Sequence, residues 1–340
     1  MKVIKDLSIE VPGTNAHYFN LDEFSSDGGD SALYYGYNYL ESAKSIESAA
    51  AYRRRIYLNV TMPTEFCSPQ PIDADDKFDE IYGICPYTNR WLNAIKGVNK
   101  YRDIFYPFNE RDIPALQRKK YDVCYHGGIH GEKYIGALKI MRKFNYRFMS
   151  QTHGINGLTK KHLKYATNTN LTNREKLELI AQCRISLCFN TFDIRNDDDI
   201  RNIQSRKHWW ENEAFKHIDD LKIAPQFKSR CNEAAFSRTL NLVKKDPWNI
   251  IEYYYTPDVD FVYFEDLNVL EDTIRGILGN WERYQPMIER AYRKSLHYTT
   301  ENLLNLIENN QAWGGHADIV LAESGGITPV KDATVREDRG

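Results

Sequence analysis

The sequence is notable first for what it lacks along its 340 residues. It has no apolar run of membrane-spanning length and no apolar leader near its amino terminus, so we expect neither a membrane span nor a secretion signal. Its formal net charge is only −2, so no strong positive field attracts nucleic acid or anionic lipid. We therefore expect a soluble protein of the cytoplasm, or of the host cytoplasm if the source is viral.

Several chemical motifs are also absent. The chain has no Cys/His spacing suited to zinc, no P-loop and no G-x-S-x-G nucleophile elbow. Its six cysteines include no C-x-x-C pair, and several lie in apolar runs such as VCY and SLCF. This pattern is typical of buried free thiols in a reducing compartment.

The residues that are present predict two domains. The length exceeds one ordinary core, and 42% apolar residues suffice for packed interiors. Predicted strands and helices alternate, which favours an α/β chain with mainly parallel sheets. A proline-containing, mixed-charge linker at 107–120 suggests the boundaries. The expected units are a first domain at 1–115, a second domain at 120–310 and a loosely held tail at 311–340.

Hydrophobic patterning places elements along both halves. In the first half it predicts a weak strand at 16–20, a helix at 30–50, and strands at 55–61, 78–84 and 101–106. In the second half it predicts strands at 121–125, 144–150 and 185–190, and helices at 132–143, 172–182, 267–278, 281–295 and 300–309. Thr172 with Glu175 three residues later forms a predicted capping box.

The segment 224–242, APQFKSRCNEAAFSRTLNL, carries the most chemical information. Lys228 and Arg230 precede or enter the first turn of a predicted helix, where backbone N–H groups already favour an anion. Glu233 follows one turn later, where a carboxylate accepts hydrogen bonds from sugar hydroxyls. Cations that can bind phosphate, beside a carboxylate that can bind sugar hydroxyls, predict a nucleotide-sugar site. A solvated helix start would give the same pattern.

Polar residues at two strand ends add to this site. Gly127 and Gly128 separate a strand from a helix, the place where an α/β sheet opens a ligand crevice, although a tight turn alone explains them. His126 and His130 flank the pair and suit either structure or a ligand contact. Asn190 ends the strand at 185–190 and is a candidate contact for the donor sugar or base, with ordinary strand-end polarity as the alternative.

The order of these landmarks resembles a known family. Asp122-Val123 with Gly127-Gly128, ISLCFN at 185–190, RCNEA at 230–234 and the ending FVYFED…LEDTIRGIL…YRKSLHYTTENLL are similar to the donor domain of group-1-like GT-B glycosyltransferases. The resemblance covers about residues 120–310. It implies two Rossmann-like domains facing across a cleft, an acceptor-binding domain at 1–115 and a nucleotide-sugar-binding domain at 120–310. It also implies a nucleotide-diphospho-sugar donor, no cofactor and no metal.

The resemblance also implies individual roles. Arg230 and Lys228 would pair with the diphosphate, Glu233 would hold the ribose hydroxyls, and Gly127 and Gly128 would let the backbone approach the ligand. Asn232 and Asn190 complete the expected donor-binding set. Many retaining relatives carry a second glutamate eight residues before the ribose glutamate, whereas this chain has Pro225 there. The stereochemical outcome therefore stays open.

An inverting transferase needs a general base on the acceptor hydroxyl. The candidates in the first domain are Glu65, Asp27 and His17. Asp258 and Asp260 match the D-x-D metal motif of the other glycosyltransferase fold, but we expect a solvated loop there.

The acceptor is expected to be a carbohydrate or a glycosylated molecule. Two alternatives stay open. A sugar transferase acting on a DNA base would use the basic runs 53–55 and 118–120 as phosphate contacts. A binding module without enzyme activity would have kept the nucleotide site alone.

Overall fold

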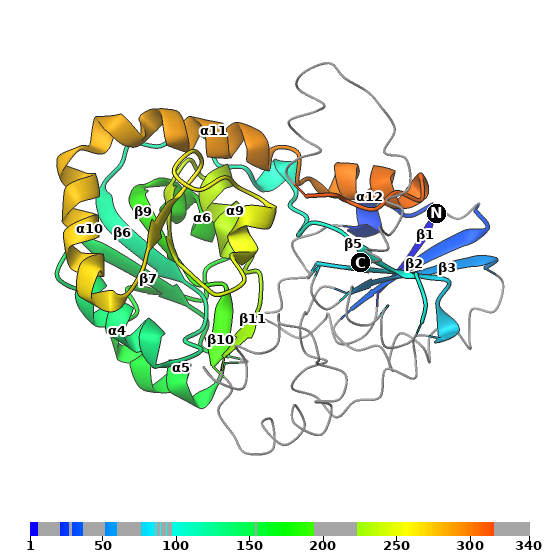
Figure 1. Ribbon diagram of the computed structural model, residues 1–340, viewed down its shortest axis with the longest axis horizontal. Helices are drawn as coiled ribbons and strands as arrows, with labels where there is room; N and C mark the ends of the chain where they lie inside the picture. The colour runs from blue at the N-terminus through cyan, green and yellow to red at the C-terminus, as the bar shows by residue number, and fades with distance from the viewer. Residues whose placement is uncertain are drawn as a thin grey trace, which may run out of the picture.

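Two parallel sheets form the framework of the molecule (Figure 1). The computed structural model describes residues 1–5, 21–26, 29–36, 52–59, 76–84, 86, 89, 93, 97–153, 155–193 and 223–315. Within them lie a five-stranded sheet, a six-stranded sheet and a small two-stranded antiparallel pair. The predicted class, two Rossmann-like α/β domains, is confirmed.

The first sheet uses its strands in sequence order. Its members are β1 (Lys2–Lys5), β2 (Ser31–Gly36), β3 (Arg54–Asn59), β4 (Glu80–Gly83) and β5 (Tyr101–Asp103). All neighbours pair in parallel. The side chains of its central strands are buried on both faces, as expected for a parallel sheet between covering layers.

The helix predicted at 30–50 is wrong at its start, because Ser31–Gly36 is strand β2. Ala32, Leu33, Tyr34 and Tyr35 are all buried, so this segment is a continuous apolar run rather than an alternating one. A short run of this kind fits a buried strand and a buried helix equally well by periodicity. The weak strand predicted at 16–20 lies outside the described residues.

The second sheet has the order β13-β12-β9-β6-β7-β8. Its strands are β6 (Tyr121–His126), β7 (Tyr146–Ser150), β8 (Asn168–Thr169), β9 (Cys183–Cys188), β12 (Leu240–Lys244) and β13 (Val262–Phe264). Side chains along β6 alternate between its two faces. Val123 and Tyr125 pack in the same cluster as helices α4 (Glu132–Met141) and α10 (Leu267–Gly279), whereas Cys124 packs with α6 (Asn173–Ala181).

Most predicted elements of this half are confirmed to within a few residues. The capping box of α6 is present, because Thr172 accepts from the Glu175 backbone N–H and Glu175 accepts in return. Helices α11 (Gln285–Ser295) and α12 (Thr300–Glu308) also form. The short helix α5 (Gly157–His162) and the pair β10 (Thr191–Asp193) and β11 (Ile223–Pro225) were not predicted.

The chain crosses between the sheets twice, and the crossings lie side by side. Phe108 donates its N–H to the Tyr298 carbonyl at 2.9 Å, and its carbonyl accepts from the Thr300 N–H at 2.9 Å. After the second crossing, α12 lies over the first sheet (Figure 1). The Arg54 guanidinium donates to the Ile307 carbonyl at the end of α12 at 2.7 Å. Residues 300–313 thus pack on the first sheet, although the sequence groups most of them with the second half.

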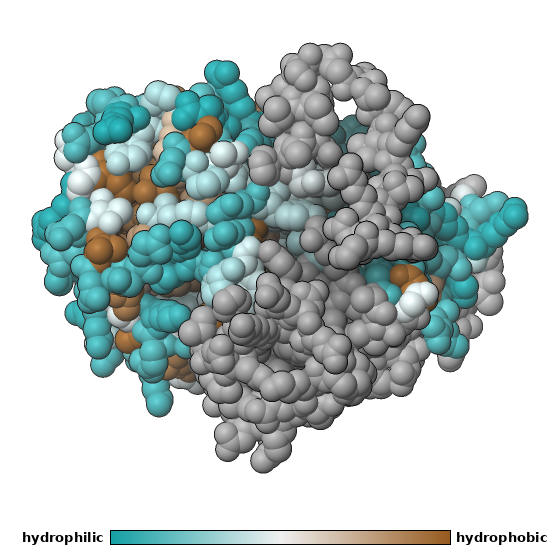
Figure 2. Space-filling view, viewed as in Figure 1, coloured by the Kyte–Doolittle hydropathy of each residue, from teal (hydrophilic) through white to brown (hydrophobic). Residues whose placement is uncertain are grey.

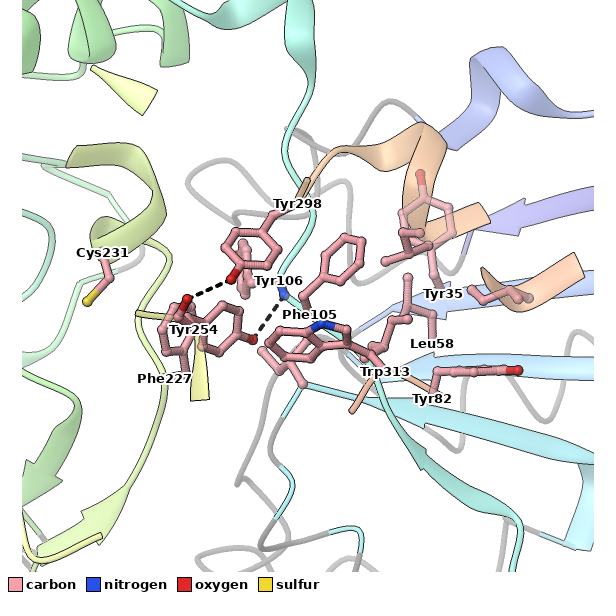
Figure 3. Close-up of a cluster of buried hydrophobic side chains, with 14 of the residues drawn as sticks. Tyr35, Leu58, Tyr82, Phe105, Tyr106, Phe227, Cys231, Tyr254, Tyr298 and Trp313 are labelled. Atoms are coloured by element: carbon pink, nitrogen blue, oxygen red, sulfur yellow. Dashed lines mark hydrogen bonds between the residues drawn. The ribbon is translucent and has the colours of Figure 1, made fainter. Parts of the chain in front are cut away.

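Aromatic side chains fill the junction (Figure 3). Tyr254 stacks on Phe227 with centroids 3.7 Å apart, and its hydroxyl accepts from the Tyr106 N–H at 3.1 Å. The Tyr298 hydroxyl donates to the Tyr254 carbonyl at 2.7 Å. Trp313 is also buried here, so the segment predicted as a loose tail from 311 begins with an anchored side chain. Residues 316–340 lie outside the described part.

Hydrophilic side chains cover much of the described surface on the face shown in Figure 2. The large apolar side chains that are exposed, such as Leu116 and Val269, are scattered, which is ordinary for a globular surface. No helix in the described ranges is both long and apolar enough to cross a bilayer.

Candidate functional site

The second sheet has a topological switch point between β6 and β9. The chain runs from β6 to β7 and β8 on one side, then returns to β9, β12 and β13 on the other. In open α/β sheets, ligands bind at the carboxyl ends of the two strands that flank such a point. Here those ends carry His126, Gly127 and Asn190, and the first turn of α9 (Arg230–Phe236) contacts both.

Arg230 is a buried cation with no carboxylate in ion-pair distance among the described residues. It is 6% exposed. Its Nη1 donates to the Tyr125 hydroxyl at 2.8 Å, and its guanidinium carbon lies 4.7 Å from the centre of the Tyr125 ring. Burial raises the pKa of Tyr125 to about 12, so this partner stays neutral. A buried guanidinium without an anionic partner is costly, and a bound anion would offset that cost.

Gly127 lets the guanidinium lie against the backbone. Its φ of +102° lies in a region that side-chain-bearing residues rarely adopt. A Cβ added there would stand 2.5 Å from Nη2 of Arg230. The sequence predicts that Gly127 lets the backbone approach a ligand closely. In the structure, the group that lies against the Gly127 backbone is the Arg230 guanidinium. At Gly128 an added Cβ would meet the His130 ring at 2.8 Å.

Glu233 forms a buried trio with two residues. One carboxylate oxygen accepts from Lys176 Nζ at 3.1 Å, and the other lies 3.0 Å from His126 Nδ1. Burial opposes its ionisation, but Lys176 and the hydrogen bond from His126 hold the pKa of Glu233 well below its usual range. Burial lowers the pKa of His126, so its ring is neutral and donates through Nδ1 to the carboxylate. Both carboxylate oxygens of Glu233, the predicted ribose-binding residue, are therefore bonded to protein groups.

Lys228 and Asn190 are held next to each other. The Lys228 N–H donates to Asn190 Oδ1 at 3.1 Å, and the Cys231 thiol donates to the same oxygen at 3.5 Å. Lys228 keeps part of its surface exposed, yet the surrounding protein and the neighbouring Arg230 lower its pKa well below the usual value. An anion bound beside both cations would reverse that shift.

Asn232 serves the junction in this structure. Its amide nitrogen donates to the Tyr106 carbonyl at 3.1 Å, and its oxygen accepts from the Tyr255 hydroxyl at 2.9 Å. Its predicted role in binding the nucleotide-sugar stays a prediction. Both ends of its amide are already bonded within the protein. The structure therefore joins the first turn of α9 to the aromatic cluster between the sheets.

The predicted bases Glu65, Asp27 and His17 lie outside the described residues and stay predictions. The solvated loop expected at Asp258 and Asp260 is wrong for Asp260, which is 2% exposed and pairs with Lys294. Its carboxylate also accepts from the Thr256 N–H at 2.8 Å. In the described ranges, no group of three or more His, Cys, Asp or Glu residues is arranged to hold a metal ion.

The predicted thiols and basic runs are now placed. Four of the cysteines, Cys124, Cys183, Cys188 and Cys231, are buried and free, as predicted. Three of the six residues in the basic runs 53–55 and 118–120 bond to protein groups, whereas Arg53, Arg118 and Lys120 are exposed. Arg54 pairs with Glu80, Arg55 pairs with Asp79, and Lys119 donates to the carbonyls of Ala181 and Arg238.

Sequence reasoning missed Tyr125 and Lys176 as members of the site. Tyr125 belongs to an apolar strand, where an aromatic side chain usually fills the core. Lys176 lies on the polar side of a helix, where a lysine is usually solvated. Only the fold brings α6, α9 and β6 together, so no local signal identifies either residue.

Sequence comparisons gave no match, neither among protein-family models nor among curated proteins. Solved structures do match. HepE from Anabaena in complex with UDP-glucose is 12% identical over 82% of this chain and 78% of its own, with a TM-score of 0.53. A single-residue mutant of TarM from S. aureus, in complex with fondaparinux, α-GlcNAc-glycerol and UDP, is 10% identical over 83% and 56%, with a TM-score of 0.52.

Sucrose-phosphate synthase from Thermosynechococcus elongatus is 8% identical over 86% of this chain and 74% of its own, with a TM-score of 0.53. These likenesses establish the GT-B fold for this chain. The chain spans little more than half the length of TarM.

Proposed function

We propose that this protein is a glycosyltransferase that moves a sugar from a nucleotide-diphospho-sugar to an acceptor hydroxyl. The observation that carries the proposal is Arg230, a buried guanidinium at the switch point of the second sheet with no carboxylate partner in the described ranges. A diphosphate is the anion that fits beside two cations two positions apart, Lys228 and Arg230.

The chemistry of glycosyl transfer explains why cations beside the diphosphate would speed the reaction. Glycosyl transfer breaks the bond between the sugar C1 and the diphosphate, and negative charge grows on the departing phosphate. Fixed cations in a dry site stabilise that charge without having to reorganise. Arginine is well suited because its planar fork forms two parallel bonds to phosphate oxygens. Helix α9 has only seven residues, so we assign the stabilisation to the side chains rather than to the helix dipole.

The fold supports the donor class. HepE and TarM share this fold, and their structures contain UDP-glucose and UDP respectively. We propose a donor of the same kind, with the sugar and the base still to be identified. The two cations supply the charge that a metal would otherwise bring, so we propose transfer without a metal or another cofactor.

The acceptor is proposed to be a carbohydrate or a glycosylated molecule held by the first domain. Arg54, Arg55 and Lys119 bond to protein groups, which leaves Arg53, Arg118 and Lys120 as the exposed members of the basic runs and favours a carbohydrate acceptor over nucleic acid. The general base is proposed among Glu65, Asp27 and His17. Single replacements of each by the uncharged amide or by Ala should identify it through loss of transfer with donor affinity retained.

The decisive experiment compares two arginines that stack on tyrosines at opposite ends of β6. Arg230 lies against Tyr125 near the carboxyl end, and Arg147 lies 3.5 Å from the ring centre of Tyr121 at the amino end. We expect UDP-, GDP-, ADP- or dTDP-sugars to raise the melting temperature, since ligand at ~100 times its Kd adds about 2.7 kcal/mol.

Arg230→Gln should abolish that shift, and Arg147→Gln should retain it. Equal shifts in both variants would remove the basis of the proposal. Binding without transfer or hydrolysis from any donor in the panel would favour a module without enzyme activity.

A further inference from the structure

Two buried polar atoms in the site have no hydrogen-bond partner within the described residues. They are Nε2 of His126 and Nδ2 of Asn190. His126 is 3% exposed and Asn190 is 1% exposed. Buried polar groups are nearly always bonded, so two exceptions at neighbouring strand ends call for an explanation.

The two atoms lie at the switch point itself. His126 ends β6 and Asn190 follows the end of β9, and these strands pair in parallel. Residues of the first turn of α9 touch both, since Glu233 contacts His126 and Cys231 contacts Asn190. Arg230 begins the same turn and packs against Gly127, the residue after His126.

The hydrogen-bonding character of each atom is fixed by its own neighbours. Asn190 Oδ1 accepts from the Lys228 N–H, so the other end of the amide must be the NH2 donor. His126 Nδ1 faces a carboxylate and therefore carries the proton, which leaves Nε2 of a neutral ring as a bare acceptor. Lys176 keeps Glu233 charged and so maintains this tautomer.

We propose, on the basis of the proposed function, that His126 and Asn190 recognise the nucleotide-sugar: His126 Nε2 accepts from a sugar-ring hydroxyl and Asn190 Nδ2 donates to an oxygen of the same ligand. Glu233, with both oxygens occupied, acts as a positioning residue for His126. The hydroxyl belongs either to the ribose or to the transferred sugar. A hydrogen-bond acceptor and a hydrogen-bond donor beside the proposed diphosphate site select a ligand with several hydroxyl groups. A ligand that lacks the hydroxyl would leave these buried groups unpaired.

The test uses the full chain and calorimetric titration. The probes are UDP, GDP and ADP, the 2′-deoxy and 3′-deoxy forms of whichever binds, UDP-glucose, and inorganic pyrophosphate. His126→Asn keeps a donor toward Glu233 and removes the Nε2 acceptor, whereas His126→Gln places an amide oxygen near the Nε2 position. His162→Asn is the matched control, since His162 lies in α5 and bonds to the Leu158 carbonyl.

We expect His126→Asn to weaken the ribonucleotide or UDP-glucose about threefold to tenfold, the loss of one hydrogen bond, and to leave pyrophosphate binding unchanged. His126→Gln should restore part of the affinity, and His162→Asn should match the wild type. Asn190→Asp should weaken the nucleotide more than it weakens pyrophosphate.

The ligand analogues identify the hydroxyl. If it belongs to the ribose, the effect of His126→Asn disappears with the 2′-deoxy or the 3′-deoxy nucleotide. If it belongs to the transferred sugar, the effect appears with UDP-glucose alone.

The contrary outcomes are distinct. Wild-type affinity of His126→Asn for every probe would mean that Nε2 meets only water, and the inference falls while an effect of Arg230→Gln keeps the proposed function. Equal losses for nucleotide and pyrophosphate would make His126 purely structural and also overturn the inference. A wild type that binds no nucleotide overturns both proposals. Circular dichroism and thermal melting of each variant confirm that losses do not come from unfolding.

Discussion

The two halves of the molecule treat their arginines differently. On the first sheet, Arg54 bonds to both carboxylate oxygens of Glu80, at 2.7 and 2.9 Å, and to the Ile307 carbonyl. Beside the second sheet, Arg230 of α9 is more deeply buried, and its one side-chain hydrogen-bond partner in the described ranges is a neutral tyrosine. The first arrangement completes itself within the chain. We propose that an anion from outside completes the second, which would distinguish a binding charge from a structural one.

The largest effect should come from Glu233, a buried charge of the site that is paired within the chain. Glu233→Gln removes the anion that Lys176 faces in a buried setting, and breaking a buried pair in this way costs about 3–5 kcal/mol. The pKa of Glu233 is depressed in the folded protein, so its contribution is present above its usual value of about 4.3 and is lost as the pH falls below that.

Urea titrations should therefore show a large gap between wild type and Glu233→Gln at pH 7 that narrows toward pH 3. Equal stability at pH 7 would mean that the trio does not stabilise the fold.

Asp246 is a second buried carboxylate, and one of its oxygens has no hydrogen-bond partner in the described ranges. Its Oδ1 accepts from the Trp248 N–H at 3.0 Å, while its Oδ2 has no partner in the described ranges. Burial raises its pKa to about 6, so between about pH 4 and pH 6 the folded state holds more protons than the unfolded state. Stability due to this group falls as the pH rises through that window.

Asp246→Asn cannot ionise and should be more stable than the wild type above pH 6.5, by at most about 3 kcal/mol. Thermal melts at pH 7.5 and pH 4 should show this advantage shrinking at the lower pH. If Asp246→Asn were less stable than the wild type at pH 7.5, the ionised Asp246 carboxylate would have to be stabilised by an ionic partner, contrary to this prediction.

Exchanging each arginine for methionine tests the comparison directly. Arg54→Met loses a partly exposed bidentate pair and a helix-end contact, and we expect a loss of about 1–2 kcal/mol. Arg230→Met removes a buried charge that has no carboxylate partner in the described ranges, so stability should stay the same or rise by about 1 kcal/mol, while nucleotide affinity falls. Urea unfolding with a parallel binding titration checks both. Losses of similar size in the two variants would erase the distinction between them.

The smallest effects concern the glycine beneath Arg230. Gly127→Ala places a side chain at a φ of +102° and displaces the guanidinium, so we expect about 1 kcal/mol of lost stability and weaker nucleotide binding. Gly276→Ala in α10 is the control. Nothing lies within 4 Å of its added Cβ, and helix propensity predicts a gain of about 0.5–1 kcal/mol. Unchanged nucleotide affinity in Gly127→Ala would show that the position of the guanidinium is not critical.

The fold of the second half could be predicted because its signals are local. A capping box, short apolar strands followed by helical patterns, and helix signals at 267–278 and 281–295 each specify one element. The first half could not be predicted as well, because a run such as Ala32–Tyr35 is apolar throughout and carries no period. The return of α12 to the first sheet depends on a distant contact with Arg54, which no window of sequence contains.

The candidate site could be predicted in part for a similar reason. Arg230, Lys228 and Glu233 stand close together in sequence, so their clustering is visible there. The charge balance among them is not, because Lys176 and Tyr125 come from other elements. The same separation conceals that Glu233 has both oxygens occupied while His126 keeps a bare nitrogen.

The side-by-side crossings at Phe108 and Thr300 have a practical consequence for dissecting the protein. A fragment that stops at residue 115 would omit a helix of its own unit and would expose the apolar surface that Leu303, Leu304 and Ile307 cover. A separately expressed amino-terminal fragment should therefore carry residues 300–313 spliced to it through a short connector. The carboxyl-terminal fragment, in turn, should end near Leu296.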